Sequence, residues 1–546
     1  MADSRRAAQT APSPELWQPL LQEFREQRAL IAQGGGKKAI DRQHEKGRLT
    51  ARERIAKLID PGTDFMELGL WAAWKMYEEW GGAPSAGVVC GVGQVSGRTC
   101  LIAANDATVK AGAFFPMSAK KLLRAQRIAM ENRLPLIYLV DSAGVFLPLQ
   151  DEVFPDEDDF GRIFRNNSVI SAQGIPQLAA IMGHCVAGGG YLPVLCDKSL
   201  ITEGSGLYLA GPALVKSAIG QVATSEELGG AEMHTQISGT VDFREPNDDS
   251  CLERIRSLVS SYAPDTQAEC YRPSPSAEPA IPTAEIYNHI SPHSQAQYEI
   301  RKILECLVDA DSFQEYRTDY GKTLICGYAR LGGYRVGILA NQHHPEKTPH
   351  GLEFGGVIYR ESAEKGARFI MDCNQNWLPI IFLQDVNGFM VGKESEQGGI
   401  IRAGAKMVNV ISNSRVPKLT VIIGGSFGAG NYAMCGKAFD PRLIYAWPNA
   451  QCAVMGGTQA ASTLLEVQIS ALKRQGKTPD AEELQELRKQ TEASYKEKTD
   501  IRYSGARGWV DDIIEPDQTR KVLIESLKLT TRAVGAIDFK TGVLQV

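Results

Sequence analysis

Several signatures are missing from this sequence, and each absence removes a class of protein. No apolar run approaches the ~20 residues that a transmembrane helix needs. The 11 cysteines never form a Cys-x-x-Cys pair, so neither a zinc ribbon nor a secreted disulfide framework is indicated, and we expect a reducing compartment. Basic residues do not exceed acidic ones: 59 Lys and Arg stand against 64 Asp and Glu. That balance argues against nucleic acid as the main partner.

Motifs for ATP, for metals and for secretion are missing as well. No Gly-x-x-x-x-Gly-Lys-Ser/Thr loop is present to hold ATP phosphates. His184 and His234 lack partners at metal-ligand spacing, so we predict no metal bound by this chain. The N-terminal residues MADSRRAAQTAPS contain no apolar segment, which speaks against a secretory signal, and Asp3 counts against a mitochondrial presequence. We expect a cytoplasmic protein.

Glycine, by contrast, is plentiful. The chain of 546 residues has 53 glycines, about 10% where ~7% is usual. This excess indicates tight turns and backbone amides that another group approaches closely. Six of the 27 prolines lie in residues 263–294. This segment predicts an interdomain linker, with an ordered surface loop as the alternative.

The halves on either side of this segment resemble each other in three blocks that keep their order. The first block aligns Val88–Asp106 with Leu324–Gln342 at an offset of 236. The second block aligns Arg133–Gly144 with Trp377–Gly388 at an offset of 244. The third block aligns the segment from Ile181 with the segment IIGGSFGAGNYAMCG, and places Ala187-Gly188 against Ala429-Gly430 at an offset of 242. Chance similarity between glycine-rich strands would not keep this order and spacing. We therefore predict a duplicated domain.

Each half has the pattern of an α/β domain. Val88–Val95 and Cys100–Ala104 are apolar runs joined by Ser96-Gly97, which predicts a hairpin. Ala119–Asn132 has helical spacing, and the apolar run LPLIYLV before Asp141 is typical of a strand buried on both faces. Glycines at the strand ends predict a site at that edge of a stacked α/β domain.

These patterns predict the domain organisation. We expect an N-terminal helical segment (1–48), a first α/β domain (49–262), a Pro-rich linker (263–294) and a second α/β domain (295–546) that includes a charged helical insertion (462–498).

Two glycine-rich turns that follow buried strands are the candidate catalytic elements. They comprise Ala187, Gly188 and Gly189 in the first half, and Ala429 and Gly430 in the second. Consecutive N–H groups at a helix start can bind an oxyanion, and small side chains let a carbonyl approach. The alternative is close helix–strand packing. If the turns bind oxyanions, valine at Gly188 or Gly430 should leave the fold intact and slow the reaction.

One further motif, Gly424-x-Ser426-x-Gly428, has the form of a hydrolase nucleophile elbow. That fold needs a histidine after the serine, and the last histidine here is His350. We interpret the motif as accidental.

Longer stretches allow a family to be recognised. They are GRLTARERIAKLIDPGTDFMELG, NDATVKAGAFFPMSAKKLLRAQRIAMENRLP, VFPDEDDFGRIF, LAGPALVKSAIGQ, SEELGGAEMH, GFMVGKESEQGGIIRAGAKM, YAWPNAQCAVMGG and SGARGWVDDIIEP. With these motifs the sequence resembles the β (carboxyltransferase) subunit of biotin-dependent acyl-CoA carboxylases, nearest to the 3-methylcrotonoyl-CoA carboxylase branch that serves leucine degradation.

The resemblance implies two tandem crotonase-like (ClpP/crotonase) ββα-superhelix domains, and an active site between the N-domain of one subunit and the C-domain of another. It also implies that the biotin of carboxybiotin is the base, that Ala187-Gly188 face the acyl thioester oxygen, and that Ala429-Gly430 face the biotin urea oxygen. The substrate-binding residues it suggests are Lys110, Phe114, Ala143, Gly144, Tyr191, Gly388, Phe389, Asn431 and Tyr432.

The partners follow from the same resemblance. Biotinylation needs a Met-Lys-Met sequence, and this chain has none. The resemblance therefore implies a partner α subunit that carries biotin carboxylase and the biotin carrier, in an α6β6 assembly around a β6 hexamer. The coenzyme A thioester is the substrate.

Departures from the family pattern leave the acyl group and the direction of the reaction open. Ala143 and Leu149 stand where the methylcrotonoyl branch usually has Gly and Arg, Asp385 replaces its Asn, and the loop His343–Gly356 is longer. Some of these features resemble the glutaconyl-CoA decarboxylase carboxyltransferase subunit. A non-catalytic scaffold of the same fold is another alternative. A crotonase-type hydratase would need paired glutamates near the first turn, and none is present there.

Overall fold

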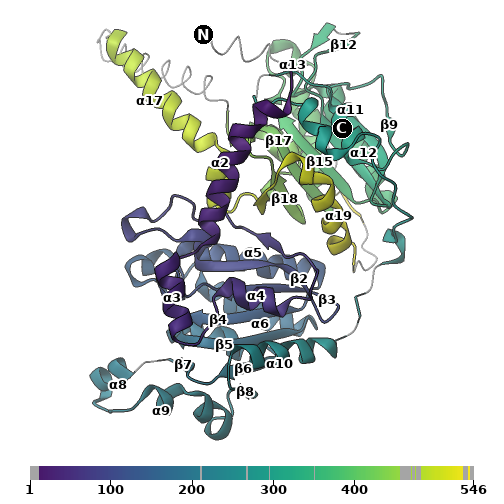
Figure 1. Cartoon of the computed structure of the whole chain (residues 1–546). Helices are drawn as coiled ribbons and strands as arrows, with labels where there is room; N and C mark the ends of the chain where they lie inside the picture. Colours follow the sequence, from purple (N-terminus) through teal and green to yellow (C-terminus); the bar gives the residue numbers. More distant parts are fainter. Residues whose placement is uncertain are drawn as a thin grey trace. The chain divides into compact units, whose positions relative to one another are not determined.

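The computed structural model describes residues 11–209, 212–262, 264–265, 268–293, 296–349, 351–455, 469, 474, 481–532 and 539–541. The chain divides into two compact units, both built from β-sheet and α-helix (Figure 1). Unit A comprises residues 25–266 and 505–508, and unit B comprises residues 1–24, 267–504 and 509–546. The domain boundaries expected from the sequence remain a prediction.

Unit A contains a sheet with the order β1-β2-β3-β4-β5-β6-β8, and β7 pairs with β5. Its strands are β1 (Met66–Leu68), β2 (Val88–Val95), β3 (Arg98–Asn105), β4 (Leu136–Ser142), β5 (Gln177–Val186), β6 (Lys198–Thr202), β7 (Gly206–Tyr208) and β8 (Phe243–Glu245). β2 and β3 form the predicted antiparallel hairpin, and β3 to β6 run parallel. Parallel strands end at one edge, so the turns after them gather there.

Unit B repeats this sheet with the order β20-β18-β17-β15-β11-β10-β9, and β19 pairs with β17. Its strands are β9 (Gln314–Tyr316), β10 (Leu324–Leu331), β11 (Tyr334–Asn341), β15 (Ile380–Val386), β17 (Lys418–Phe427), β18 (Leu443–Ala446), β19 (Gln451–Ala453) and β20 (Asp512–Ile513). Two small sheets accompany it: β12 (Glu346–Thr348) with β13 (Gly351–Glu353), and β14 (Val357–Ile358) with β16 (Gly388–Phe389).

Helices surround both sheets. In unit A they are α3 (Lys37–Glu45), α4 (Ala51–Leu58), η1 (Glu78–Trp80), η2 (Pro84–Gly87), η3 (Lys110–Gly112), α5 (Pro116–Asn132), η4 (Leu147–Glu152), α6 (Phe160–Ala172), η5 (Ala187–Gly190), α7 (Tyr191–Val194), α8 (Pro212–Ile219), α9 (Ser225–Gly229), η6 (Met233–Ile237) and α10 (Asp248–Ser260). In unit B they are η7 (Glu269–Tyr271), η8 (Thr283–Asn288), α11 (Ile300–Leu307), α12 (Arg360–Gln375), α13 (Lys393–Gln397), α14 (Ile400–Asn413), α15 (Gly428–Ala433), η9 (Lys437–Phe439), α17 (Ala481–Thr499), η10 (Pro516–Gln518) and α19 (Thr519–Thr530). Helices α2 (Pro14–Ala32) and α18 (Ile501–Ala506) each have residues in both units.

Local sequence explains several helix starts. Thr50 caps α4 through a capping box with Glu53, which satisfies backbone N–H groups that the helix leaves free. Pro116 is the first residue of α5, where its fixed φ suits a helix and its missing N–H costs nothing. The predicted helix Ala119–Asn132 is confirmed as most of α5.

The side chains confirm the duplication in detail. The guanidinium of Arg52 forms a bidentate ion pair with the carboxylate of Glu67, with N···O distances of 2.7 and 2.8 Å. Arg301 and Glu315 form the same bidentate pair, with both N···O distances at 2.8 Å. The hairpin turns match as well. The carboxylate of Asp60 accepts the N–H groups of Ser96 and Gly97, and that of Asp309 accepts those of Gly332 and Gly333. Each half therefore uses the same contacts to fix its first hairpin.

The register of the strands corrects the third block of the sequence alignment by one residue. Ser142 pairs with Cys185 in unit A, and Val386 pairs with Ser426 in unit B. β5 and β17 are both 10 residues long and match at an offset of 241. The offset of 242 was wrong because it aligned the letters Ala-Gly. By position, Ala187, Gly188 and Gly189 correspond to Gly428, Ala429 and Gly430.

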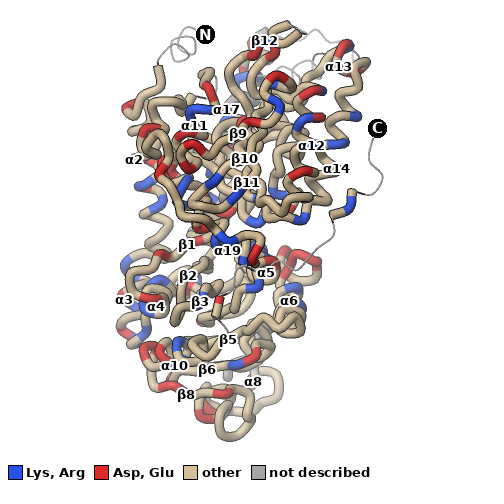
Figure 2. Tube along the Cα trace, turned by 90° about the vertical axis from the view of Figure 1, so that its right-hand side faces the viewer, with Lys and Arg blue, Asp and Glu red and all other residues tan. Residues whose placement is uncertain are grey.

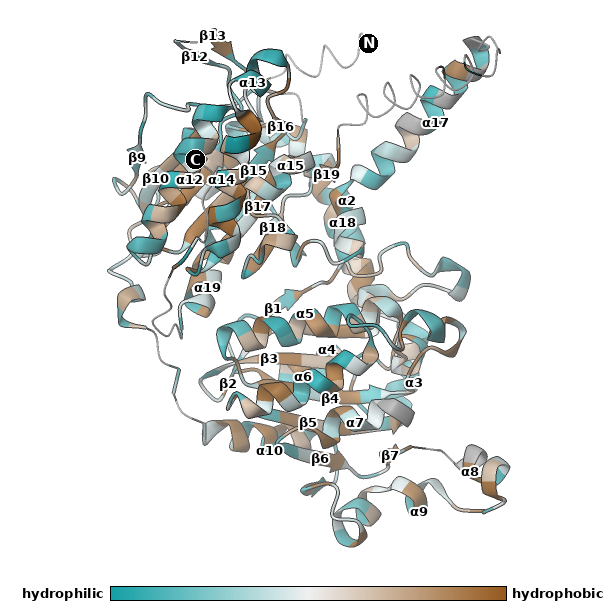
Figure 3. Ribbon diagram, turned by 180° about the vertical axis from the view of Figure 1, so that it is seen from behind, coloured by the Kyte–Doolittle hydropathy of each residue, from teal (hydrophilic) through white to brown (hydrophobic). Residues whose placement is uncertain are grey.

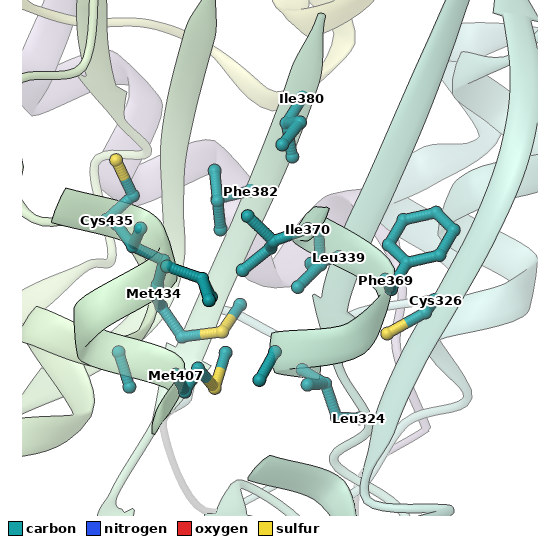
Figure 4. Packing of buried hydrophobic residues seen from close by; sticks show 14 of the residues in the cluster. Leu324, Cys326, Leu339, Phe369, Ile370, Ile380, Phe382, Met407, Met434 and Cys435 are labelled. Carbon is teal, nitrogen blue, oxygen red and sulfur yellow. The ribbon is translucent and has the colours of Figure 1, made fainter. Parts of the chain in front are cut away.

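Each sheet packs against its helices through a large apolar core. In unit B, α12 and α14 lie against the sheet, and Phe369, Ile370, Phe382 and Met407 are fully buried between them (Figure 4). In unit A, α4 and α10 supply Ile55, Leu252 and Ile255 to the core beneath β3, β4 and β5. These rigid layers hold the strand ends in place.

The segment rich in proline is packed over much of its described length. Tyr271, Ile286 and Ile290 are buried in unit B, and the Ser274 N–H donates to Gly333 O at 3.0 Å. Of the expected charged insertion, α17 is described and carries mainly polar residues (Figure 3), whereas residues 462–468, 470–473 and 475–480 lie outside the described residues.

Surface charge is mixed over the described chain. Basic and acidic residues are interspersed along the chain in both units (Figure 2). Within the described residues, no helix is both long enough and apolar enough to span a bilayer.

Candidate active site

The first candidate turn follows directly from β5. The chain leaves the strand at Val186 and enters the 3-10 helix η5, which contains Ala187, Gly188 and Gly189. The surroundings of Ala187 and Gly188 lie outside what the structure describes. Gly189 faces the neighbouring strand end: a Cβ built there would lie 3.9 Å from the Cα of Gly144. The structure thus brings Gly189 and Gly144 together at the ends of β5 and β4.

A second loop is hydrogen-bonded to this edge. Ala111 O accepts the N–H of Ala143 at 3.0 Å, and the Phe114 N–H donates to Gly144 O at 2.8 Å. Lys110 and Ala111 both have positive φ, 46° and 55°. Such strain in residues other than glycine costs ~1–3 kcal/mol each and is common at functional sites. The predicted residues Lys110, Phe114, Ala143 and Gly144 therefore share one rigid loop pair.

Aromatic rings cover one side of the first turn. Phe114 lies 4.8 Å from Phe160, Phe160 lies 5.0 Å from Phe164, and Phe164 lies 6.0 Å from Tyr191, between ring centroids. We call these four residues the aromatic row. Phe114 and Tyr191 are predicted site residues, whereas Phe160 and Phe164 were not among them, although the motif VFPDEDDFGRIF contains both. Phe114 and Phe160 in this row are buried, whereas Tyr191 is 50% exposed.

The second turn also follows the end of a buried strand. β17 ends at Phe427, and α15 begins at Gly428. The first N–H groups of a helix have no acceptor within the helix, and Gly428, Ala429 and Gly430 occupy these first positions of α15. Ala429 is exposed. Gly428, which was not among the predicted residues, has φ +53° and is the positional equivalent of Ala187.

Gly430 packs more tightly than its equivalent Gly189. A Cβ at Gly430 would lie 2.6 Å from Val386 Cγ2 and 3.2 Å from the Cα of Gly388. The expectation that valine at Gly430 leaves the fold intact is therefore wrong, because the side chain would overlap β15. Close packing, one of the two alternatives considered for this turn, therefore applies to Gly430, whereas the oxyanion role of the turn stays a prediction.

The remaining predicted residues of the second half lie around this turn. Gly388 and Phe389 form β16, which pairs with β14. Tyr432 is half-exposed, and its ring lies 5.6 Å from that of Phe439. Asn431 Nδ2 donates to Ser426 Oγ at 2.8 Å. The structure thus collects all four at the ends of β15 and β17.

Ser426 holds the turn and is not built as a nucleophile. It is fully buried, and its Oγ donates to Gln384 Oε1 at 2.9 Å. Gln384 Nε2 in turn donates to Met434 O at 2.7 Å. The network ties β15, β17 and α15 together, in agreement with the interpretation of the Gly-x-Ser-x-Gly motif as accidental.

Titratable groups beside the first turn are held in unreactive forms. Burial raises the pKa of the Cys185 thiol to about 12, and this thiol donates to Gly189 O at 3.3 Å. Burial, together with Arg48, lowers the pKa of His184. Neither group is prepared as a nucleophile or as a cationic acid. Among the described residues, no group of three or more His, Cys, Asp or Glu is placed to hold a metal.

The strained loop also contributes to the lining of a basic pocket. It has a volume of about 510 Å³ and is lined by residues from three segments: Gly34, Gly35, Ala39, Arg42, Gln43, Lys46, Gly81, Gly82, Pro84, Ala107, Thr108, Val109, Lys110 and Ala111. Three of these residues are cations and none is an acid. Lys110 lies close to Gly81, where a Cβ would be 3.2 Å from its Nζ.

Two turns rich in small residues thus follow the equivalent strands β5 and β17, and the first lies beside aromatic rings. The carboxyl transferase domain model matches residues 42–539. The β1 subunit of the biotin-dependent 3-methylcrotonyl-coenzyme A carboxylase of Mycobacterium tuberculosis is 44% identical over 515 residues, 94% of each chain. The mitochondrial methylcrotonoyl-CoA carboxylase β chain of Dictyostelium discoideum is 45% identical over 93% of this chain and 84% of its own.

A solved structure agrees with these relatives. The β subunit of geranyl-CoA carboxylase from P. aeruginosa superposes with a TM-score of 0.84 at 34% identity, and covers 97% of this chain and 96% of that one. The chain belongs to the carboxyltransferase β subunits of biotin-dependent acyl-CoA carboxylases. The predicted family and the crotonase-like α/β fold are confirmed.

Proposed function

We propose that this subunit transfers a carboxyl group from carboxybiotin, carried by a partner subunit, to a branched α,β-unsaturated acyl-CoA of the 3-methylcrotonoyl type. The observation that carries the proposal is the pair of equivalent turns after β5 and β17. When bound, carboxybiotin would supply the carboxyl group and the base. The chain's own residues would bind, orient and exclude water.

In this proposal the first turn holds the acyl thioester. N–H groups of Ala187, Gly188 and Gly189 donate to the thioester oxygen as it gains negative charge. The small residues Ala143 and Gly144 leave room for the acyl group, and the aromatic row keeps its surroundings apolar. A hydrogen-bond donor that is already oriented in a water-excluded site lowers the activation free energy by ~2.7–4 kcal/mol.

The second turn holds the urea oxygen of biotin. N–H groups of Gly428, Ala429 and Gly430 would be the donors, and Gly388, Phe389, Asn431 and Tyr432, which lie at the ends of β15 and β17, would hold the biotin ring. Because the two turns occupy equivalent positions after β5 and β17, each half of the repeat would serve one of the two developing oxyanions.

The basic pocket suits the phosphates of coenzyme A. Arg42, Lys46 and Lys110 provide three positive charges without a neighbouring acid in the lining. Lys110 and Ala111 belong both to this pocket and to the loop that bonds Ala143. An extended acyl-CoA could therefore place its phosphates on one side of the loop and its thioester on the other.

Exposed apolar side chains beside each turn support a site that is completed by a second copy. Leu147 and Phe154 beside the first turn are 72% and 75% exposed, and Val391 and Ile401 beside the second are 75% and 77% exposed. Such side chains are unfavourable in water unless covered. The proposal places the first turn of one copy against the second turn of another, in a closed β6 ring with α subunits around it, in the cytoplasm.

Turnover of the assembled holoenzyme on a panel of acyl-CoAs tests the proposal. We expect the highest kcat/KM with 3-methylcrotonoyl-CoA, and lower values with geranyl-CoA and propionyl-CoA. Decarboxylation of glutaconyl-CoA at a higher kcat/KM would replace the proposal by the decarboxylase alternative. Absence of carboxyl transfer with every member of the panel would favour the scaffold alternative.

A further inference from the structure

The aspartates that end β4 and β15 are equivalent in position but have different partners. Asp141 faces the buried guanidinium of Arg54, whose Nη1 lies 3.4 Å from its Oδ2. The helix that supplies Arg54 corresponds to α11, where Ile303 takes its place and is fully buried. The carboxylate of Asp385 is 6% exposed as a residue and has no arginine from that helix.

Two aromatic residues hold Asp385 instead. The Tyr298 hydroxyl donates to Asp385 Oδ2 at 2.8 Å, and His343 Nε2 lies 3.6 Å from the same oxygen. The rings of Tyr298 and His343 are stacked, with centroids 5.2 Å apart and planes 7° apart. Burial and the Asp385 charge hold the pKa of Tyr298 well above its usual value, so its hydroxyl remains a donor at neutral pH.

Asp385 in turn controls the end of the strand that leads to the second turn. Its Oδ1 accepts the N–H of Gly425 at 2.6 Å, three residues before α15 begins. A Cβ at Gly424 would overlap the same carboxylate, so only glycine lets β17 approach it. A carboxylate that could rotate would leave the Gly425 N–H unpaired and the strand end less constrained.

We propose that Asp385 is a positioning residue for the second turn, and that Tyr298 and His343 hold its carboxylate in the required orientation. Through Gly425, this group sets the direction in which the N–H groups of Gly428 to Gly430 point. In the first half, Arg54 holds the carboxylate of Asp141 in the same way. The inference rests on the proposed function of the second turn as the biotin-side oxyanion site.

The test measures two reactions on the assembled holoenzyme: decarboxylation of chemically prepared carboxybiotin without acyl-CoA, and binding of acyl-CoA by calorimetry. Asp385→Ala should slow decarboxylation about 100-fold, the scale of a misplaced reacting group, with the Kd for acyl-CoA unchanged. Asp385→Asn should recover to within about fivefold of wild type, because its amide oxygen still accepts the Gly425 N–H. Tyr298→Phe, which keeps the stacked ring, should lose about 10-fold.

If Tyr298→Phe in a folded holoenzyme decarboxylates carboxybiotin at a rate within twofold of wild type, the inference is overturned. This variant remains a valid test even where Asp385→Ala fails to fold. An Asp385→Asn variant as slow as Asp385→Ala would overturn it too. Asp141→Asn is the matched control in the first half and should alter acyl-CoA binding or turnover while sparing carboxybiotin decarboxylation. If the Asp385 variants instead weaken acyl-CoA binding alone, the positioning role stands and the assignment of the second turn to biotin fails.

Discussion

Gly189 lies beside Gly144 with room for one methyl group: a Cβ at Gly189 would make an ordinary contact of 3.9 Å with the Gly144 Cα. At the equivalent Gly430, the Cβ would lie 2.6 Å from Val386. Two positions that are alike in the backbone therefore respond differently to the same substitution.

Gly189→Ala should fold normally and slow turnover, because the methyl group narrows the approach to the first turn. We expect Tm within about 2 °C of wild type and a loss of kcat/KM of about 10-fold or more. Gly430→Ala should lower the free energy of unfolding by ~1–3 kcal/mol, the usual effect of overpacking. Thermal melts and steady-state kinetics on both variants check this. A destabilised Gly189→Ala with normal activity in the folded fraction would contradict the role of the first turn.

Lys46→Ala and Arg42→Ala should raise KM for acyl-CoA about 5- to 20-fold with kcat nearly unchanged, because the pocket binds phosphate distant from the reacting atoms. The effect should shrink as salt screens the remaining charges. Lys57→Ala, which removes an exposed cation paired with Asp249 in the same unit, is the control and should leave KM unchanged. Equal increases in all three variants would argue against a phosphate pocket.

Arg54→Met should destabilise unit A by ~3–5 kcal/mol, because it leaves Asp141 and Asp248 buried without their cation. Burial raises the pKa of Asp141, and Arg54 opposes that rise. A raised pKa means that protonation favours the folded state, so the stability associated with neutral Asp141 is lost as pH rises through that pKa. Without Arg54 the pKa rises further. The deficit should therefore be larger at pH 8 than at pH 5, as measured by urea unfolding.

The control for this variant is Arg127→Met, which removes an exposed pair with Glu131 on α5. We expect a change below ~1 kcal/mol and no trend with pH. A pH-independent deficit in Arg54→Met would show that lost packing, rather than the charge of Asp141, dominates.

Iodoacetamide at pH 8 should modify Cys270, which is exposed, and spare Cys185, whose pKa burial raises to about 12. Activity should persist after this modification. Peptide mapping of the native and the urea-unfolded protein checks both statements, and labelling of native Cys185 with loss of activity would contradict them.

The purified chain should be negative on an avidin blot and inactive without a biotin-bearing partner, because it has no Met-Lys-Met sequence. Adding the α subunit should restore carboxylation. A positive blot on this polypeptide, or an active monomer by light scattering, would contradict the proposed assembly.

Much of the fold was accessible from local sequence. The hairpin of β2 and β3, the helix α5, and the strand β4 follow from turn glycines, helical spacing and an apolar run, each a property of neighbouring residues. The repeat was visible for the same reason, since both copies preserve their glycines and strand lengths. The two turns are strand ends rich in small residues, and the sequence alone was therefore enough to predict them.

Only the tertiary structure decided the details that depend on contacts between distant residues. The strand register replaced the offset of 242 by 241 and added Gly428, because identical letters do not report which residues pair across a sheet. The aromatic row and the basic pocket join residues far apart in the chain. The same holds for the support of Asp385 by Tyr298, 87 positions away: no local pattern encodes it, because packing alone brings the two side chains together.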